Sequence, residues 1–356
     1  MNYFNKKSLK SQVKDYLYEQ INGGKLKPGD KLPSQRELSE SLGVSKRIAD
    51  IALRELELEN IIFRRVGKGS FLLDKENLPC KFPVDSDTVL VVVPTLRNPA
   101  FSTFVEDVER RLSTQGKRIR VGLCPSLVSR KKYYLSMLEK EGTAGVIGIS
   151  TPEFLCAYAG CNHIPLVNVG VEQSGAHNQI VTDLQKAGVL TAEHLLETGH
   201  KAVTCAGCFP YGRGTPMDVR FAAICESLGG HGVDVSVVPQ RGKSSMDMDY
   251  EAIGRALVER ILAMKRRPSA IAFYNDARAM GGMKALREKG FTIPRDFSIV
   301  GFDNIFSSSL VAPALTTIDC GYEQAAAHAV DMIINKEAAR KLVLKPKLII
   351  RESTRK

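Results

Sequence analysis

A chain of 356 residues is longer than one typical domain, and its 44% hydrophobic and 25% charged content is that of an ordinary globular protein. Its longest apolar runs, such as residues 89–93, are too short to cross a bilayer, and the polar, basic start of the chain lacks the apolar core of an export signal. We therefore expect a cytoplasmic protein that does not bind a membrane.

The net charge of +11 is unevenly distributed along the chain. Residues 1–73 contain 14 basic and 9 acidic residues, so a net charge of +5 lies on about a fifth of the length. Such a density of positive charge favours an anionic partner for this part of the chain.

The eight cysteines are scattered, mostly among apolar neighbours, which is typical of reduced, buried thiols. Cys205 and Cys208 form one C-x-x-C pair, but neither a second such pair nor a nearby histidine pair accompanies it. We therefore expect no metal site.

Two short helices joined by a tight turn are predicted within residues 31–71. Ser34 and Glu37 have the spacing of a capping box, in which each side chain bonds the backbone N–H of the other residue. Gly43 tolerates the positive φ that ends a helix, and Ser45 can cap the helix that follows. This arrangement is a helix-turn-helix.

Two strands are predicted next, at residues 61–66 and 70–73, around a glycine-containing tip that carries Lys68. An amphipathic helix is predicted upstream, at residues 8–21. Together with the helix-turn-helix, these elements predict a winged helix-turn-helix domain over residues 1–73.

This part of the chain resembles the DNA-binding domain of the GntR family, in which the second helix of the motif enters the major groove and the wing approaches the minor groove. The matching residues, at fixed offsets, are Pro28, Gly29, Asp30, Leu32, Pro33, Ser34, Arg36, Glu37, Leu38, Gly43, Val44, Ser45, Ala52, Leu53, Leu56, Gly67, Gly69 and Phe71. The resemblance implies that double-stranded DNA is contacted by six residues, Arg36, Ser45, Lys46, Arg47, Gly67 and Lys68.

Asp50 departs from the GntR pattern, which usually has an arginine at this position. A carboxylate on a DNA-facing helix repels phosphate. Two interpretations are open: Asp50 accepts a hydrogen bond from a cytosine amino group, or its side chain points elsewhere and the operator differs from the usual one.

Residues 74–87 contain prolines and acidic residues without periodicity, which predicts a linker. From residue 88 the chain alternates between apolar strands and amphipathic helices. Strands are predicted at residues 89–93, 119–123, 145–149, 166–169, 202–205, 233–238, 270–274, 298–302 and 342–350. Helices are predicted at residues 101–115, 129–140, 154–160, 184–198, 219–228, 250–263, 277–289 and 322–334. This order predicts an α/β fold of parallel sheets with helices on both faces, divided into two lobes over residues 88–352.

Polar and aromatic side chains follow several of the predicted strands. In open parallel sheets, ligands bind outside the carboxyl ends of the strands. The residues in question include Phe101, Asn168, Arg220, Asn275 and Asp303. Carboxylate, amide and guanidinium groups suit adjacent hydroxyls, and a ring suits the apolar face of a sugar. Each Asp or Asn alone is better explained as a helix cap, but the set favours a pocket.

The same region resembles the effector domain of LacI/GalR regulators, whose fold is the two-lobed periplasmic-binding-protein type with three crossovers. The resemblance is carried by Asn98, Pro99, Phe101, Asp183, Gly188, Leu195, Gly199, His200, Arg220 and the stretches 273–276, 281–304 and 313–318. It implies effector contacts from Arg220, Asn275 and Asp303, with Phe101 lining the cleft. The family's acidic contact is not clearly kept near Asn168 and Glu172, which are the residues present there.

The combination of the two domains resembles AraR-type arabinose repressors. We therefore expect a homodimeric repressor of carbohydrate-utilisation genes, released from operator DNA by a pentose or related sugar. A constitutive dimeric DNA-binding protein is the alternative. An enzyme fused to a DNA-binding domain is disfavoured, since no P-loop, GxGxxG after the first strand, HExxH or GxSxG is present and no cofactor is expected.

Overall fold

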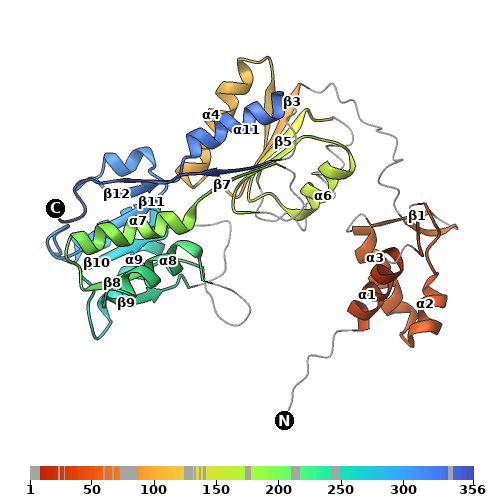
Figure 1. Ribbon diagram of the computed structural model, residues 1–356, viewed down its shortest axis with the longest axis horizontal. Helices are drawn as coiled ribbons and strands as arrows, with labels where there is room; N and C mark the ends of the chain where they lie inside the picture. Colours follow the sequence, from red (N-terminus) through yellow and green to blue (C-terminus); the bar gives the residue numbers. More distant parts are fainter. Residues whose placement is uncertain are drawn as a thin grey trace, which may run out of the picture.

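The structure is a computed structural model, in which the chain folds as a small helical unit and a larger α/β unit (Figure 1). It describes residues 9–22, 25–27, 29–58, 61–65, 68–72, 87–123, 131, 134–135, 138, 142–172, 178–209, 217–241, 249–335 and 340–356. The predicted linker, apart from Asp87, the predicted site residue Gly67 and most of the helix predicted at 129–140 lie outside these residues. None of the helices among the described residues is both long and apolar enough to span a membrane.

The small unit is the predicted winged helix-turn-helix. Its elements are α1 (Leu9–Asn22), α2 (Gln35–Leu42), α3 (Lys46–Leu58), β1 (Ile62–Arg65) and β2 (Gly69–Leu72). Three helices enclose a core that includes the buried side chains Val13, Leu17, Leu38, Leu53 and Leu56. β1 and β2 pair antiparallel, and an isolated bridge from Lys31 to Phe71 adds the segment before α2 to this wing.

The caps predicted for the helix-turn-helix are confirmed. The Ser34 hydroxyl accepts a hydrogen bond from the Glu37 N–H at 3.2 Å, and the Glu37 carboxylate accepts one from the Ser34 N–H at 2.6 Å. Gly43 ends α2 with a left-handed φ of 65°. The Ser45 hydroxyl accepts from the Ile48 N–H at 3.3 Å and so starts α3. These local bonds position the two helices of the motif.

The first lobe of the α/β unit is built on a six-stranded sheet in the order β13-β7-β6-β5-β3-β4. Its strands are β3 (Thr88–Val93), β4 (Arg118–Leu123), β5 (Gly145–Ile149), β6 (Leu166–Gly170), β7 (Asn178–Thr182) and β13 (Lys341–Leu344), and its helices include α4 (Pro99–Ser113), α6 (Glu153–Cys161) and α11 (Tyr322–Ile334). Along β3, Val89, Val91 and Val93 pack with α4 and α11, while Leu90 and Val92 face α6. Both faces of the sheet are therefore covered, as predicted.

The second lobe has a six-stranded sheet in the order β14-β12-β11-β10-β8-β9. Its strands are β8 (Ala202–Ala206), β9 (Asp234–Val238), β10 (Ala270–Phe273), β11 (Ser298–Phe302), β12 (Thr316–Asp319) and β14 (Lys347–Ile349). The helices α7 (Leu184–Glu197) and α8 (Val219–Gly229) cover one face, and α9 (Tyr250–Leu262) and α10 (Asp276–Glu288) cover the other.

The chain passes between the two sheets three times. It crosses after β7, after β12 and between β13 and β14, and Figure 1 shows these segments running between the lobes. The Thr182 hydroxyl donates to the Cys320 carbonyl oxygen at 2.7 Å and so ties the first crossing to the second. The two lobes are therefore joined by adjacent segments rather than by one flexible linker.

The structure differs from the sequence-based expectation at the last strand. One strand was expected over residues 342–350, but β13 pairs with β7 in the first lobe and β14 pairs with β12 in the second, with Pro346 between them. A proline cannot donate to a ladder, so the strand is interrupted there. β14 runs antiparallel to β12, which makes the second sheet mixed rather than wholly parallel. The short strands β7 and β12 were not anticipated.

Gly188 lets α7 and α8 pack closely. A Cβ at this position would lie 2.4 Å from the Arg220 carbonyl oxygen and 2.7 Å from the Ala223 Cβ. We expect Gly188→Ala to lower the free energy of unfolding by about 1–3 kcal/mol, because the overpacked helices must separate. Urea unfolding monitored by circular dichroism measures this change.

Gly229→Ala is the matched control. Gly229 is the last residue of α8, and a Cβ there would meet no heavy atom within 4 Å. The substitution should leave stability unchanged or increase it by up to about 1 kcal/mol, since it restricts the unfolded chain. Equal destabilisation by the two substitutions would contradict the close-packing argument.

Candidate functional site

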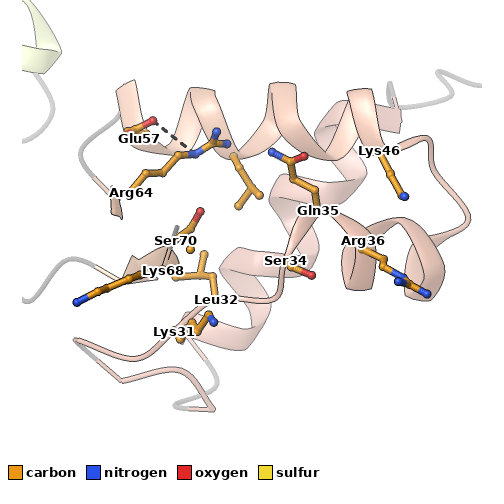
Figure 2. A pocket seen from close by; sticks show the side chains of 12 residues that line it. Lys31, Leu32, Ser34, Gln35, Arg36, Lys46, Glu57, Arg64, Lys68 and Ser70 are labelled. Atoms are coloured by element: carbon orange, nitrogen blue, oxygen red, sulfur yellow. Dashed lines mark ion pairs between the residues drawn. The ribbon is translucent and has the colours of Figure 1, made fainter. Parts of the chain in front are cut away.

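A basic hollow lies between the helix-turn-helix and the wing (Figure 2). It has a volume of about 810 Å³ and contains five cationic side chains and one carboxylate, Lys31, Arg36, Lys46, Arg64, Lys68 and Glu57. The cations come from the segment before α2, from α2 and α3, and from the wing, so the fold gathers them on one face. Such a concave, positively charged surface suits the phosphate backbone of DNA.

The predicted DNA contacts from the helices lie on the surface. Lys46 and Arg47 are exposed in the first turn of α3, and the side chain of Arg36 is 76% exposed, with its Nε donating to Glu40 Oε1 at 2.8 Å. Ser45 is exposed as well, but its hydroxyl oxygen accepts the capping bond of α3. Arg36 and Lys46 line the hollow, whereas Arg47 is not among its lining residues.

Asp50, in α3, makes close contacts within the domain. Its Oδ1 accepts from Gln35 Nε2 at 2.6 Å and from Arg64 Nη1 at 2.9 Å, and its Oδ2 lies 2.9 Å from Arg54 Nε. The hydrogen bond from Arg64 and the charges of Arg54 and Arg64 hold the pKa of this carboxyl below its usual range, against the effect of burial. Of the two interpretations left open by the sequence, the structure therefore favours a carboxylate that binds within the protein.

A second pocket, of about 140 Å³, lies between the two lobes of the α/β unit. The first lobe contributes Asn98, Phe101, Ile149, Ser150, Gly170, Val171, Thr182 and Tyr322, and the second contributes Leu184, Arg220, Tyr274, Asn275, Asp303 and Cys320. The pocket lies beside the carboxyl ends of β5, β10 and β11, where the strand order predicts a ligand.

Arg220, at the start of α8, is 7% exposed and is held on three sides. Its Nε and Nη2 donate to Asp218 Oδ1 and Oδ2 at 2.9 and 3.1 Å, and its Nη1 donates to the Tyr274 carbonyl oxygen at 3.1 Å. Its guanidinium carbon lies 4.1 Å from the centre of the Tyr274 ring. Burial acts to lower the pKa of Arg220, but Tyr274 and Asp218 outweigh it and raise the pKa. The guanidinium is thus a fixed, charged donor.

Asp303 follows β11 in an unusual backbone conformation. Its φ is 107° and that of Asn304 is 53°, values that non-glycine residues adopt rarely. Buried Asp276 holds this turn, because its Oδ2 accepts from the Ile305 N–H at 2.9 Å and its Oδ1 accepts from the Thr317 hydroxyl at 2.6 Å. Burial raises the pKa of Asp303 to about 7, although Arg220, Arg278 and a hydrogen bond from Asn98 lower it.

Asn275 has two roles in the structure. Its Oδ1 accepts from the Arg278 N–H at 3.1 Å and so caps α10, which is the role that the sequence favours for a single Asn at this position. The same residue, 4% exposed, lines the pocket. Capping and pocket lining are therefore compatible at this position.

Comparisons with known proteins agree with both units. Residues 9–72 match the bacterial regulatory proteins of the gntR family, and residues 192–354 match the periplasmic binding protein-like domain. The arabinose metabolism transcriptional repressor of Geobacillus stearothermophilus is 26% identical, with 97% of each chain covered. The HTH-type transcriptional repressor PurR of Edwardsiella ictaluri is 30% identical over 72% of this chain and 76% of its own. The chain belongs to the HTH-type transcriptional repressors, and it joins a gntR-type DNA-binding domain to a periplasmic-binding-protein-like domain.

A solved structure supports the fold of the larger unit. A LacI family transcriptional regulator from Enterococcus faecium, with bound ribose, has a TM-score of 0.65 and 22% identity, and the match covers 75% of this chain and 98% of that one. At this identity the likeness concerns the fold. The two-lobed, periplasmic-binding-protein-like architecture expected from the sequence is confirmed.

Four of the six residues predicted to bind the effector are brought together in the pocket: Phe101, Arg220, Asn275 and Asp303. The other two are placed elsewhere. Asn168 is fully buried, where its Oδ1 accepts from the Thr151 N–H at 2.8 Å and its Nδ2 donates to the Val171 carbonyl oxygen at 2.7 Å. Glu172 is 62% exposed and pairs with Lys341 at 2.6 Å. Asn168 therefore shapes the loop beside the pocket, and Glu172 lies on the surface.

Sequence reasoning assigned no role to two residues, Tyr322 in the pocket lining and Asp218 behind Arg220. Tyr322 meets the Phe101 ring edge-on at 6.2 Å, and Asp218 orients Arg220. Asp218 directly precedes α8 and reads as an ordinary helix cap, which it also is. Cys205 and Cys208 are buried free thiols, and among the described residues no group of three or more potential ligands for a metal ion is present.

The raised pKa of Asp303 predicts a pH dependence of stability. Between its ordinary value of 3.8 and about 7, the folded state holds a proton that the unfolded chain has released, so this group makes folding less favourable as the pH rises through that range. We compare the free energy of unfolding of the wild type with that of Asp303→Asn. The wild-type value minus the variant value should fall from pH 5 to pH 8, by less than about 1.4 kcal/mol per pH unit. A difference that rises with pH in urea titrations would contradict this assignment.

Proposed function

We propose that the protein represses carbohydrate-utilisation genes and that a small sugar, a pentose or a related one, bound between the lobes releases it from operator DNA. The single observation that supports this best is the convergence of Phe101, Arg220, Asn275 and Asp303, from both lobes, on one pocket in a chain that also carries a basic DNA-binding face. DNA binding is assigned to residues 1–73, the connection to 74–87, and effector binding and dimerisation to 88–352.

The chemistry of the pocket supports a neutral, polyhydroxylated effector. Asp303 accepts hydrogen bonds from ring hydroxyls, and the Arg220 guanidinium, oriented by Asp218, donates to hydroxyl or ring oxygens. The Phe101 ring lines the pocket, where an aromatic ring can cover the C–H groups of a sugar. Since Arg220 already has a carboxylate partner and Asp303 adds a further carboxyl group, the pocket has no excess of positive charge for a phosphorylated sugar.

DNA is proposed to lie across the basic hollow with the start of α3 in the major groove. Arg36, Lys46 and Arg47 then approach base edges or phosphates near the groove, and Lys68 of the wing contacts the backbone. We retain Ser45 as a residue at this face, where its main role is to cap α3.

The coupling of effector to DNA requires a second copy of the chain. Two exposed apolar side chains of the second lobe, Phe306 at 78% and Leu310 at 67% exposure, suit a protein interface. In a two-fold dimer, closure of the lobes around the effector changes the spacing of the two DNA-binding domains, so each ligand alters the affinity for the other by the same factor.

Arg220→Ala tests the effector site. We expect operator affinity without sugar to be unchanged, and sugar affinity to fall by about 10- to 100-fold, because a buried, charged hydrogen-bond donor is lost. Gel-shift titrations against a panel of pentoses, hexoses and their phosphates measure both quantities. Arg266→Ala, which removes an exposed arginine of the same lobe, is the control and should respond as the wild type does. If no sugar changes the operator affinity of the wild type, the protein is instead a constitutive DNA binder.

Arg47→Ala and Lys68→Ala test the DNA-binding face. Arg47, at the start of α3, should contribute to base recognition, so its loss should weaken binding to the selected site more than to random DNA. Lys68 is a phosphate contact in the wing, and its loss should weaken both by similar factors and reduce the salt slope by about 1. Fluorescence anisotropy at several salt concentrations measures these differences. If Arg47→Ala lowers the affinity for selected and for random DNA by equal factors, the role of Arg47 in base recognition is contradicted.

A further inference from the structure

The carboxylate of Asp50 joins three elements of the DNA-binding domain. It is placed on α3, and it accepts hydrogen bonds from Gln35 of α2 at 2.6 Å and from Arg64 of β1 at 2.9 Å. Arg54, one turn further along α3, reaches its other oxygen at 2.9 Å. The Asp50 side chain is 22% exposed, so these bonds are partly shielded from water. A negative charge on a helix that approaches DNA thus binds within the protein.

This contact determines the orientation of the Gln35 amide. An ionised carboxylate has no hydrogen to donate, so the atom of Gln35 that faces it must be the amide nitrogen. The neighbouring arginines keep the pKa of Asp50 low and the carboxylate ionised at neutral pH. The amide oxygen of Gln35 is then turned away from Asp50. In Figure 2 the nitrogen lies on the side of Arg64 and the oxygen on the side of Lys46.

Gln35 is in a position to meet DNA. It is the first residue of α2, it is partly exposed, and it lines the basic hollow between Lys46 and the wing. An acceptor presented in the major groove pairs with a base that carries a donor there, which is N6 of adenine or N4 of cytosine.

We propose that Asp50 is a positioning residue that fixes Gln35 as a hydrogen-bond acceptor, so that Gln35 selects adenine or cytosine at one position of each half-site. This inference rests on the proposed DNA-binding function and adds a base preference to it. Asp50 itself does not touch the base. Where the family usually has an arginine, this chain therefore has a residue that acts on DNA through a neighbouring side chain.

A purely structural role for Asp50 makes a different prediction. If Asp50 only braces β1 against α3 through Arg64, its loss lowers stability and weakens binding to all DNA sequences alike. If it also orients Gln35, its loss removes the preference at one base pair, because the released amide can rotate and present either its nitrogen or its oxygen. The base preference, rather than the affinity, therefore separates the two roles.

The test is selection from a random DNA duplex library with four full-length proteins: wild type, Asp50→Asn, Gln35→Ala and Glu55→Gln. Glu55→Gln is the matched control, since it removes the same charge from the same helix. Glu55 Oε1 lies 2.8 Å from Lys10 Nζ of α1, and Glu55 does not line the basic hollow. Thermal unfolding of each variant verifies that it is folded.

We expect the wild type and Glu55→Gln to enrich the same site with the same preference for adenine or cytosine. Asp50→Asn and Gln35→Ala should lose that preference, by about five- to tenfold, at one shared position while keeping the rest of the site. Combining Asp50→Asn with Gln35→Ala should cause little further loss, because both changes act on one contact.

Two results would overturn the inference while leaving DNA binding intact. One is an unchanged base preference in Asp50→Asn, and the other is a loss in Asp50→Asn at a position where Gln35→Ala has no effect. If the wild type enriches no sequence at all, the DNA-binding function fails instead, so the two failures are distinguishable.

Discussion

The triple passage of the chain between its two sheets is the constraint on which the effector half of the molecule depends. Because β7, β12 and β13 all lead directly into the other lobe, neither lobe is a continuous stretch of sequence. The hydrogen bond from Thr182 to the Cys320 carbonyl oxygen holds two of these passages together at the base of the pocket. The lobes can therefore change their mutual angle only by bending the crossings, and the ligand pocket lies beside that hinge.

Polar groups beside the hinge are oriented by hydrogen bonds to neighbouring carboxylates. Asp218 orients Arg220, and Asp276 supports the strained turn that carries Asp303. Gly301 is part of the same arrangement, since a Cβ there would lie 2.1 Å from Asp276 Oδ1. Preorganised groups of this kind lose little entropy when they bind a ligand. The DNA-binding half uses the same principle, with Asp50 behind Gln35 and Arg64.

Local patterns in the sequence predicted the small domain well because its fold is built from local bonds. The capping box of Ser34 and Glu37, the left-handed Gly43 and the Ser45 cap each involve residues within a few positions of one another. The buried strands were found in the same way, since β3 places alternate residues on opposite faces and is apolar from Val89 to Val93. Their positions after predicted strands and the resemblance to LacI/GalR regulators then singled out Arg220, Asn275 and Asp303, which the tertiary structure brings into one pocket.

What the sequence by itself determined is therefore the order of the elements, the winged helix-turn-helix, the two-lobed architecture and three polar residues of the pocket, Arg220, Asn275 and Asp303. The tertiary structure alone decided that Asn168 is buried beneath a loop, that Glu172 pairs on the surface and that the last strand is divided between two sheets. It also decided that Asp50 bonds to Gln35 and Arg64, which lie 15 and 14 positions away in the sequence. These outcomes depend on which distant groups meet in space, and neither periodicity nor capping signals carry that information.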